Sequence, residues 1–394
     1  MLLIKEGQRG KMKRKWMLVA AMVLVVAMIL SLPLTGCKTT TETTAAAETT
    51  AAAETTSAAE TTAAAETTAA PVEKFKVGFS NGLITHSWRT QMTADLVQEF
   101  GYYKGQGIVD ELLIQHAGFD VDLQISQIRN LINSGVDLLL INPNSLSALD
   151  PVIEEAVDQG VLVFAVDQPV SSDVAYQIIP DQVVWQSRLT EYVAGRIDGK
   201  GDVVYMSGYD GSPANTDRDK GLADTLAKYP DIKLLTKVNG NWDPSTAQQA
   251  MASVLAAFPK IDAVISQDGM CLGVVKAFQA ANRPTPIMNG EGMIPFMDEW
   301  KILRESEEFE AFAIANAPGF TVNYALGVGL RMLQGKTIKD GFFNVSEKSA
   351  SVLLGPDFDN STLDTVYDEH LTTRGIADYI DDWPSQEELD ALFE

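Results

Sequence analysis

The stretch from Gly135 to Pro169 constrains the fold most, because it joins two strand patterns through one helix pattern. Residues 136–141 and 161–166 are apolar runs rich in Val, Leu and Ile, and the helical pattern between them ends at Gly160. Such runs, connected by a helix with a glycine stop, are typical of a βαβ unit in a parallel sheet that is buried on both faces. The stretch therefore predicts an α/β fold.

Both strands of this unit end at a polar side chain. Asn142 follows the first apolar run and Asp167 follows the second. Open α/β sheets bind ligands outside the carboxyl ends of their strands, so an amide and a carboxylate should share one rim. The pair suits sugar hydroxyls, each of which can donate and accept a hydrogen bond.

Length and charge limit the class of protein. The chain has 394 residues, of which 46% are apolar, enough for two domains with full cores. Its net charge of −23 argues against a nucleic-acid partner. The chain has three His, too few for a His cluster, so neither a metal site nor a cofactor is predicted.

The first residues have the pattern of an export signal. Basic residues precede an apolar segment at 16–32, and Leu34-Thr35-Gly36-Cys37 follows. This order predicts a secretory signal peptide over residues 1–36. The four residues also resemble a bacterial lipobox, which implies a lipid on Cys37 and a place on the cell membrane, with the outer face of a single-membrane bacterium favoured over the periplasm. A transmembrane anchor is the alternative, although the segment is short for a span.

A low-complexity tract separates Cys37 from the rest of the chain. Residues 39–70 are Thr, Ala and Glu with one Ser, so they cannot form a core. We interpret residues 37–72 as a lipidated Cys followed by a disordered or partly helical tether. The second cysteine, Cys271, is expected to be a buried, inert thiol, which excludes a disulfide framework.

From position 75 onward, strand and helix patterns alternate. Strands are expected at 75–79, 111–115, 136–141, 161–166, 202–206, 233–238, 262–266, 286–288 and 309–315, and helices at 88–100, 122–134, 146–159, 183–197, 216–229, 245–258, 270–281 and 322–334. The alternation predicts two doubly wound sheets or one large sheet, and a break at 171–182 favours two. A closed eight-stranded barrel also fits the count.

Nearly every expected strand ends in a side chain that can bind a hydroxyl or stack on a ring. These clusters are His86, Trp88 and Arg89 after the first strand, then Arg218, Trp242-Asp243, Gln267-Asp268 and Glu291 after later strands. Each cluster has a simpler interpretation: Trp88 as a core aromatic, Arg218 as a surface ion pair, His86 as a local cap. Their repetition at strand ends favours a binding site.

From about 75 to 335 the sequence resembles bacterial periplasmic sugar-binding proteins of the ribose-binding type. The galactofuranose-binding branch shares the Val-Gly-Phe-Ser opening, here 77–80, followed by Trp88-Arg89. The resemblance implies a type I periplasmic-binding-protein fold, with two Rossmann-like doubly wound lobes joined by three hinge crossings, near 179–182, near 315–318 and after Gly335. The N-terminal lobe would comprise 73–180 and 317–338. The C-terminal lobe would comprise 181–316 and about 339–394, including a tail that the resemblance does not cover.

The resemblance also implies the ligand contacts. Matching the family's motifs position by position gives His86, Trp88, Arg89, Asn142, Asp167, Gln168, Arg218, Trp242, Asp243, Gln267, Asp268, Glu291 and Asn316. Three of these depart from the family pattern: Gln168 replaces Arg, Gln267 replaces Asn and Glu291 replaces Asp. They keep polarity but change reach and charge, so they bear on which sugar is bound. Trp88 and Trp242 are expected to sandwich the ring.

The implied function is that of a solute-binding lipoprotein that delivers a monosaccharide to an ABC importer permease, and we expect it to be a monomer. A ligand-sensing receptor for a membrane sensor is an alternative that the sequence leaves open. A secreted α/β enzyme is a weaker alternative, since the chain has no Gly-x-Ser-x-Gly, His-Glu-x-x-His or P-loop motif.

Overall fold

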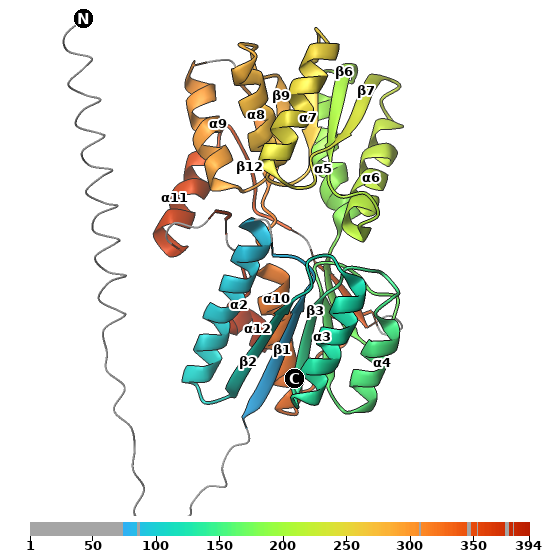
Figure 1. The fold of residues 1–394 in the computed structure, drawn as a ribbon. Helices are drawn as coiled ribbons and strands as arrows, with labels where there is room; N and C mark the ends of the chain where they lie inside the picture. Colours follow the sequence, from blue (N-terminus) through green and yellow to red (C-terminus); the bar gives the residue numbers. More distant parts are fainter. Residues whose placement is uncertain are drawn as a thin grey trace, which may run out of the picture. The chain divides into compact units, whose positions relative to one another are not determined.

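The computed structural model describes residues 74–84, 87–306, 309–344, 348–352, 354–374, 378–380 and 382–394. The predicted signal peptide, Cys37, the tether and His86 lie outside these ranges. The described chain forms two lobes, each built on its own six-stranded sheet (Figure 1). Two separate sheets rule out the eight-stranded barrel and match the expected type I fold.

The N-terminal lobe contains sheet A, in which all neighbouring strands are parallel. The strand order is β11-β5-β4-β3-β1-β2. The strands are β1 (Phe75–Asn81), β2 (Val109–His116), β3 (Leu138–Asn142), β4 (Leu162–Val166), β5 (Tyr176–Pro180) and β11 (Ser349–Val352). Their shared direction brings the carboxyl ends of β1, β3 and β4 to one edge.

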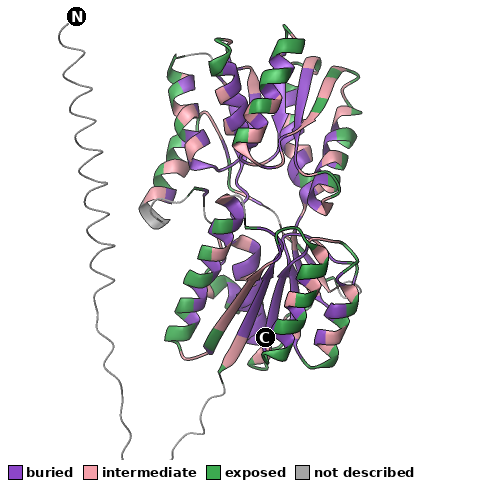
Figure 2. Cartoon of the chain, in the orientation of Figure 1, coloured by how far each residue is buried: buried purple, intermediate pink, exposed green. Residues whose placement is uncertain are grey.

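Side chains alternate along β3 between two cores, which explains its unbroken apolar sequence. Leu138 and Leu140 pack with α2 (Ser87–Gly105) and α10 (Phe320–Leu333) on one face. Leu139 and Ile141 pack with α3 (Val121–Asn133) and α4 (Asp150–Asp158) on the other. Figure 2 shows the resulting buried sheet between exposed outer helix faces.

The C-terminal lobe contains sheet B, in the order β12-β10-β9-β8-β6-β7. Its strands are β6 (Lys200–Ser207), β7 (Asp231–Asn239), β8 (Ala263–Ser266), β9 (Ile287–Gly290), β10 (Ala311–Ile314) and β12 (Asp357–Asp359). All pairs are parallel except β10 with β12. The helices are α5 (Gln182–Arg196) and α6 (Pro213–Leu226) on one face, and α7 (Pro244–Ala257), α8 (Met270–Ala280) and α9 (Ile294–Ser306) on the other.

The chain crosses between the lobes between β5 and α5, between β10 and α10, and between β11 and β12. It crosses a fourth time between α11 (Leu363–Arg374) and α12 (Gln386–Ala391), which is one crossing more than the three expected. Arg304 on α9 donates to Asp364 on α11 at 2.6 Å. Arg331 on α10 donates to Asp390 on α12 at 2.8 Å. The two tail helices therefore belong to different lobes.

The tail differs from its predicted assignment. We expected 339–394 to lie with the C-terminal lobe, but β11 pairs with β5 in sheet A and only β12 joins sheet B. The pairing is not visible in the sequence because β11 is a short, half-polar segment, Ser-Ala-Ser-Val, that adds to an existing strand edge. The elements β5, α9, α11 and α12 were likewise not predicted.

The cysteine of α8 has an apolar environment. Cys271, at the start of this helix, is fully buried, and burial raises the pKa of its thiol, in line with the predicted inert thiol. Within the described ranges, none of the helices has the length and apolar character needed to cross a bilayer. The apolar segment at 16–32 lies outside those ranges.

Two helical glycines should respond in opposite ways to alanine. Gly101 on α2 is exposed with open space around it, so Gly101→Ala should stabilise the fold by about 0.5–1 kcal/mol. At Gly221 on α6, an added Cβ would lie 2.4 Å from the carbonyl oxygen of Val183 on α5. Gly221→Ala should therefore cost about 1–3 kcal/mol. Urea unfolding followed by circular dichroism measures both, and a Gly221→Ala protein as stable as the parent would contradict the packing.

Candidate functional site

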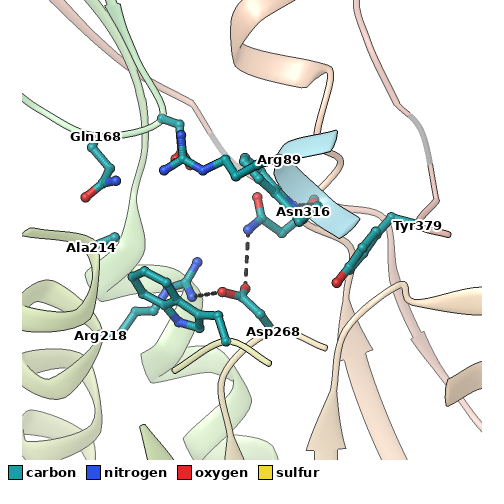
Figure 3. A pocket seen from close by; sticks show the side chains of 10 residues that line it. Arg89, Gln168, Ala214, Arg218, Asp268, Asn316 and Tyr379 are labelled. Atoms are coloured by element: carbon teal, nitrogen blue, oxygen red, sulfur yellow. Dashed lines mark hydrogen bonds and ion pairs between the residues drawn. The ribbon is translucent and has the colours of Figure 1, made fainter. Parts of the chain in front are cut away.

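Side chains from both lobes line one pocket at the facing carboxyl edges of the two sheets (Figure 3). The N-terminal lobe supplies Trp88, Arg89, Asp167 and Gln168; the C-terminal lobe supplies Ala214, Arg218, Trp242 and Asp268; and the crossing segments supply Asn316 and Tyr379. The space that protein atoms leave free is about 380 Å³, including its opening to solvent.

One buried ion pair comes from the N-terminal lobe. Arg89, near the start of α2, places Nη2 at 3.3 Å from Oδ2 of Asp167, which follows β4. Asn142 at the end of β3 donates to the same oxygen at 3.2 Å. Asp167 has φ +64°, a left-handed conformation that Asp tolerates better than most residues and that turns the chain at the strand end. Burial raises the pKa of Asp167, and the positive charges of Arg89 and Arg218 partly offset this.

A second ion pair, with a buried Arg and a partly buried Asp, comes from the C-terminal lobe. Arg218 on α6 is 2% exposed and donates through Nη1 to the Asp268 carboxylate. Its Nε donates to Oε1 of Gln182 at 2.7 Å. Burial disfavours the guanidinium charge, but Asp268 outweighs it and the pKa of Arg218 is raised. This Arg is not the surface ion pair of the simpler interpretation.

Aromatic rings hold the Arg218 guanidinium in place. Its carbon lies 4.4 Å from the ring centroid of Trp185 and 5.8 Å from that of Trp242. A planar guanidinium stacks well on aromatic faces. The Arg218 guanidinium is thus held by two rings and two hydrogen bonds, and its remaining N–H donors have a fixed direction.

The hinge residue Asn316 links the two lobes at the pocket. Its side-chain amide donates to Oδ1 of Asp268 at 3.4 Å (Figure 3), and its carbonyl oxygen accepts from Trp88 Nε1 at 2.7 Å. Asn316 follows β10 of sheet B, whereas Trp88 begins α2 in the other lobe. The contact thus ties the crossing between β10 and α10 to the start of α2.

The indole N–H groups of both tryptophans are bonded to protein. Trp88 donates to Asn316, and Trp242 donates to Oε1 of Gln267 at 2.9 Å. Trp242 has φ +53° in the tight turn that follows β7, which brings its indole to the pocket wall. Because the polar edges are occupied, the rings present apolar surface to the pocket, as stacking on a sugar requires.

Eight of the thirteen predicted contact residues line the pocket: Trp88, Arg89, Asp167, Gln168, Arg218, Trp242, Asp268 and Asn316. His86 lies outside the described residues. Asn142 and Gln267 are fully buried behind the lining, where they hold Asp167 and Trp242. Asp243 caps α7 by accepting from the Thr246 amide at 2.7 Å, which is a structural role.

Glu291 also lies behind the lining, in an unusual state. It is fully buried, and within the described part of the chain neither carboxyl oxygen has a hydrogen-bond partner. Burial raises the pKa of Glu291 well above its ordinary value, and the negative Asp268 raises it further. A buried carboxyl without a partner is far less costly when protonated, so this environment favours the neutral acid.

The described residues supply no metal centre. Among them, no group of three or more His, Cys, Asp and Glu side chains is arranged to hold a metal ion. The two carboxylates that line the pocket, Asp167 and Asp268, are each paired with an Arg. Their charge is compensated, and the site fits hydrogen-bonding solutes better than cations.

Two lining residues were not predicted. Ala214 lies in the first turn of α6 and has no polar group to reveal it. Tyr379 comes from the tail, beyond the part of the chain that resembles the family. Its ring lies beside Asp268 and Asn316 in Figure 3. No sequence signal near position 379 connects it to the other residues.

Comparison with known proteins identifies the family. Residues 77–337 match the family model described as a periplasmic binding protein domain. A xylitol-binding protein of Mycolicibacterium smegmatis is 36% identical over 196 residues, which are 49% of this chain and 56% of that protein. A D-ribose/D-allose-binding protein of Pseudomonas aeruginosa is 24% identical over 250 residues, 60% of this chain and 76% of that protein. The chain thus spans little more than half the length of the first of these relatives.

Solved structures of solute-binding proteins have a similar fold. An ABC transporter solute-binding protein from Thermobispora bispora superimposes with a TM-score of 0.71 at 28% identity, covering 81% of this chain and 94% of the other. The fructose-binding periplasmic domain of a hybrid two-component system gives a TM-score of 0.62 at 25% identity, covering 75% and 94%. The chain therefore belongs to the periplasmic binding protein family, which confirms the resemblance to sugar-binding members of the ribose-binding type.

Proposed function

We propose that this protein is an extracytoplasmic solute-binding lipoprotein that captures a neutral monosaccharide, or a polyol of similar size, and delivers it to an ABC importer permease. One observation carries the proposal: each lobe contributes one Arg–Asp pair and one indole face to the same pocket. Guanidinium and carboxylate groups saturate ring hydroxyls, while indoles cover the C–H faces of a sugar.

The charge of the pocket supports a neutral ligand. Two Arg side chains face two Asp side chains, and the raised pKa of Glu291 behind them favours its neutral form. An acidic solute would need an uncompensated cation, and an amine would need an uncompensated carboxylate. Neither is available among the described lining residues, so a solute that presents many hydroxyls and no net charge fits best.

The mechanism follows from contacts that span the lobes. Ser212 at the start of α6 donates to Oε1 of Gln168 at 2.9 Å, and the rings of Phe119 and Tyr209 meet edge-on at 4.8 Å. A ligand that both lobes share would add to these contacts and stabilise the closed form. Binding then shifts the population from open to closed forms, and the closed form docks on the permease.

The membrane assignments rest on the sequence. Lipidation at Cys37 and a tether over 38–72 would hold the lobes at the outer face of the membrane, where a monomer meets its permease. The likeness to the fructose-binding domain of a two-component system keeps a sensor role as the second candidate. We propose no catalytic role, because the relatives are binding proteins and the Asp167 carboxylate is already bonded to Arg89 and Asn142.

A thermal-shift screen of the purified protein tests the ligand class. The panel contains pentoses, hexoses, deoxysugars, polyols, nucleosides, amino acids and uronic acids. We expect one or a few neutral sugars or polyols to raise the melting temperature, since a ligand at 100 times its Kd adds about 2.7 kcal/mol. A shift with a uronic acid or an amino acid alone would contradict the neutral-ligand proposal.

Removing a contact from either lobe should weaken binding. Asp167→Ala and Trp242→Ala should each raise the Kd at least tenfold in calorimetric titration, because each loses about 1–3 kcal/mol of hydrogen bonding or stacking. Asp224→Ala, on the solvent face of α6, is the matched control and should bind like the parent. Parental affinity in both pocket variants would mean that the ligand binds elsewhere.

The buried Glu291 should make stability fall as pH rises. For a carboxyl with a raised pKa in the folded state, the unfolded chain loses its proton first, near the ordinary pKa of 4.5, and folding then weakens until the folded group also ionises. Within that window the loss is about 1.4 kcal/mol per pH unit. Glu291→Gln, which is always neutral, should abolish this part of the decline.

Urea unfolding between pH 4 and pH 9 measures the effect. The difference in unfolding free energy, Glu291→Gln minus parent, should grow with pH from about 4.5 upward. Glu154→Gln, on the exposed face of α4, controls for the loss of one carboxylate. A difference that is constant across the range would show that Glu291 does not stay protonated.

A further inference from the structure

The tail beyond the family's matched region enters the pocket. The family model ends at residue 337, whereas Tyr379 lines the site. The tail passes from β11 in sheet A to β12 in sheet B, then along α9 through α11, and returns to α10 through α12. Residues 378–380 lie on the return crossing. These three residues therefore lie between the two lobes and can contact both of them.

These three residues are bonded to the C-terminal lobe through their main chain. Ile294 at the start of α9 donates its amide hydrogen to the carbonyl oxygen of Asp378 at 2.8 Å. Ile380 donates to the carbonyl oxygen of Gly292 at 2.7 Å. Met293 and Tyr379 form an antiparallel bridge between these bonds. The segment thus adds a short strand beside the loop that carries Glu291.

The same segment is bonded to the N-terminal lobe through one side chain. Gln91 on α2 is 8% exposed, and its Oε1 accepts from the Tyr379 amide at 2.9 Å. Its Nε2 donates to the Tyr379 carbonyl oxygen at 3.1 Å. One glutamine amide therefore satisfies both main-chain groups of Tyr379, as a neighbouring strand would. Opening of the lobes must break one of the two sets of bonds.

The Tyr379 side chain lines the pocket and is almost completely buried. It is 3% exposed, and its hydroxyl accepts from Ser87 Oγ at 3.4 Å, a long contact. A Cβ at Gly269, which precedes α8, would lie 2.8 Å from this hydroxyl, so the turn leaves room for it. A phenol can donate one hydrogen bond and accept others. The donor is available to a ligand held between Trp88 and Asp268.

We propose that Tyr379 is a specificity-determining residue whose hydroxyl donates to a ligand hydroxyl, and that residues 378–380 clamp the closed lobes through Gln91. The inference rests on the proposed sugar-binding function for its ligand contact. The clamp itself depends only on the contacts described above. A ligand that accepts a hydrogen bond from Tyr379 would further stabilise the position of residues 378–380 between the lobes. Ligand recognition and lobe closure are then coupled at this one residue.

The ligand contact is tested by deletion of the hydroxyl. Calorimetric titration compares the parent with Tyr379→Phe, using the best panel ligand and its series of monodeoxy analogues. We expect the variant to bind the full ligand five- to twentyfold more weakly and to bind one deoxy analogue as well as the parent does. Tyr367→Phe, which removes a tail hydroxyl bonded to Asp298 at 2.6 Å outside the pocket, should stay within twofold of the parent. Parental affinity of Tyr379→Phe for every ligand would overturn the assignment.

The clamp is tested without any ligand. Hydrogen exchange with mass spectrometry follows peptides that contain Tyr379 and Ile380 in the parent, in Gln91→Ala and in Gln106→Ala, an exposed control. Exchange at least tenfold faster in Gln91→Ala alone supports the clamp, and equal exchange in all three overturns it. If the parent binds no panel ligand, the sugar function fails, yet this exchange result still decides the clamp.

Discussion

Two guanidinium–carboxylate pairs, withdrawn from water at the facing edges of the sheets, are the interaction on which the site depends. Burial of such groups is costly unless their charge and hydrogen-bonding positions are compensated. The chain compensates them with Asn142 beside Asp167, Gln182 and Trp185 beside Arg218, and Asn316 beside Asp268. The hinge and the neighbouring helix starts are arranged around these partners. Within each lobe, these partners orient the charged groups that face the pocket.

The sequence predicted the features that depend on local pattern, namely the buried strands and the polar residues at their ends. A buried parallel strand must be apolar on both faces, so β3 and β4 were visible as runs, and their ends marked Asn142 and Asp167. The family resemblance then added residues from several loops at once. Eight of them meet in the pocket because parallel strands bring their carboxyl ends to one edge.

The remaining features depend on distant contacts. Gln267 is polar and follows a strand, as a ligand contact would, but its amide is used by Trp242 and by Tyr205. Glu291 has the same sequence signature, but burial and the nearby Asp268 raise its pKa, which no local pattern could reveal. Tyr379 is about 290 positions from Gln91, which fixes it, so no local pattern could place it. Only burial and long-range pairing distinguish the residues that line the pocket from those that hold the lining in place.

The two tail strands, β11 and β12, matter for a chain whose synthesis is incomplete. β11 covers the β5 edge of sheet A, and β12 covers the β10 edge of sheet B. A chain synthesised only as far as residue 348 would have both sheets largely formed but would expose two unpaired strand edges. Such edges pair readily with other chains. In the full-length chain the tail replaces these two edges by the short edge strands β11 and β12, so a prematurely terminated product would be at risk of aggregation at two places.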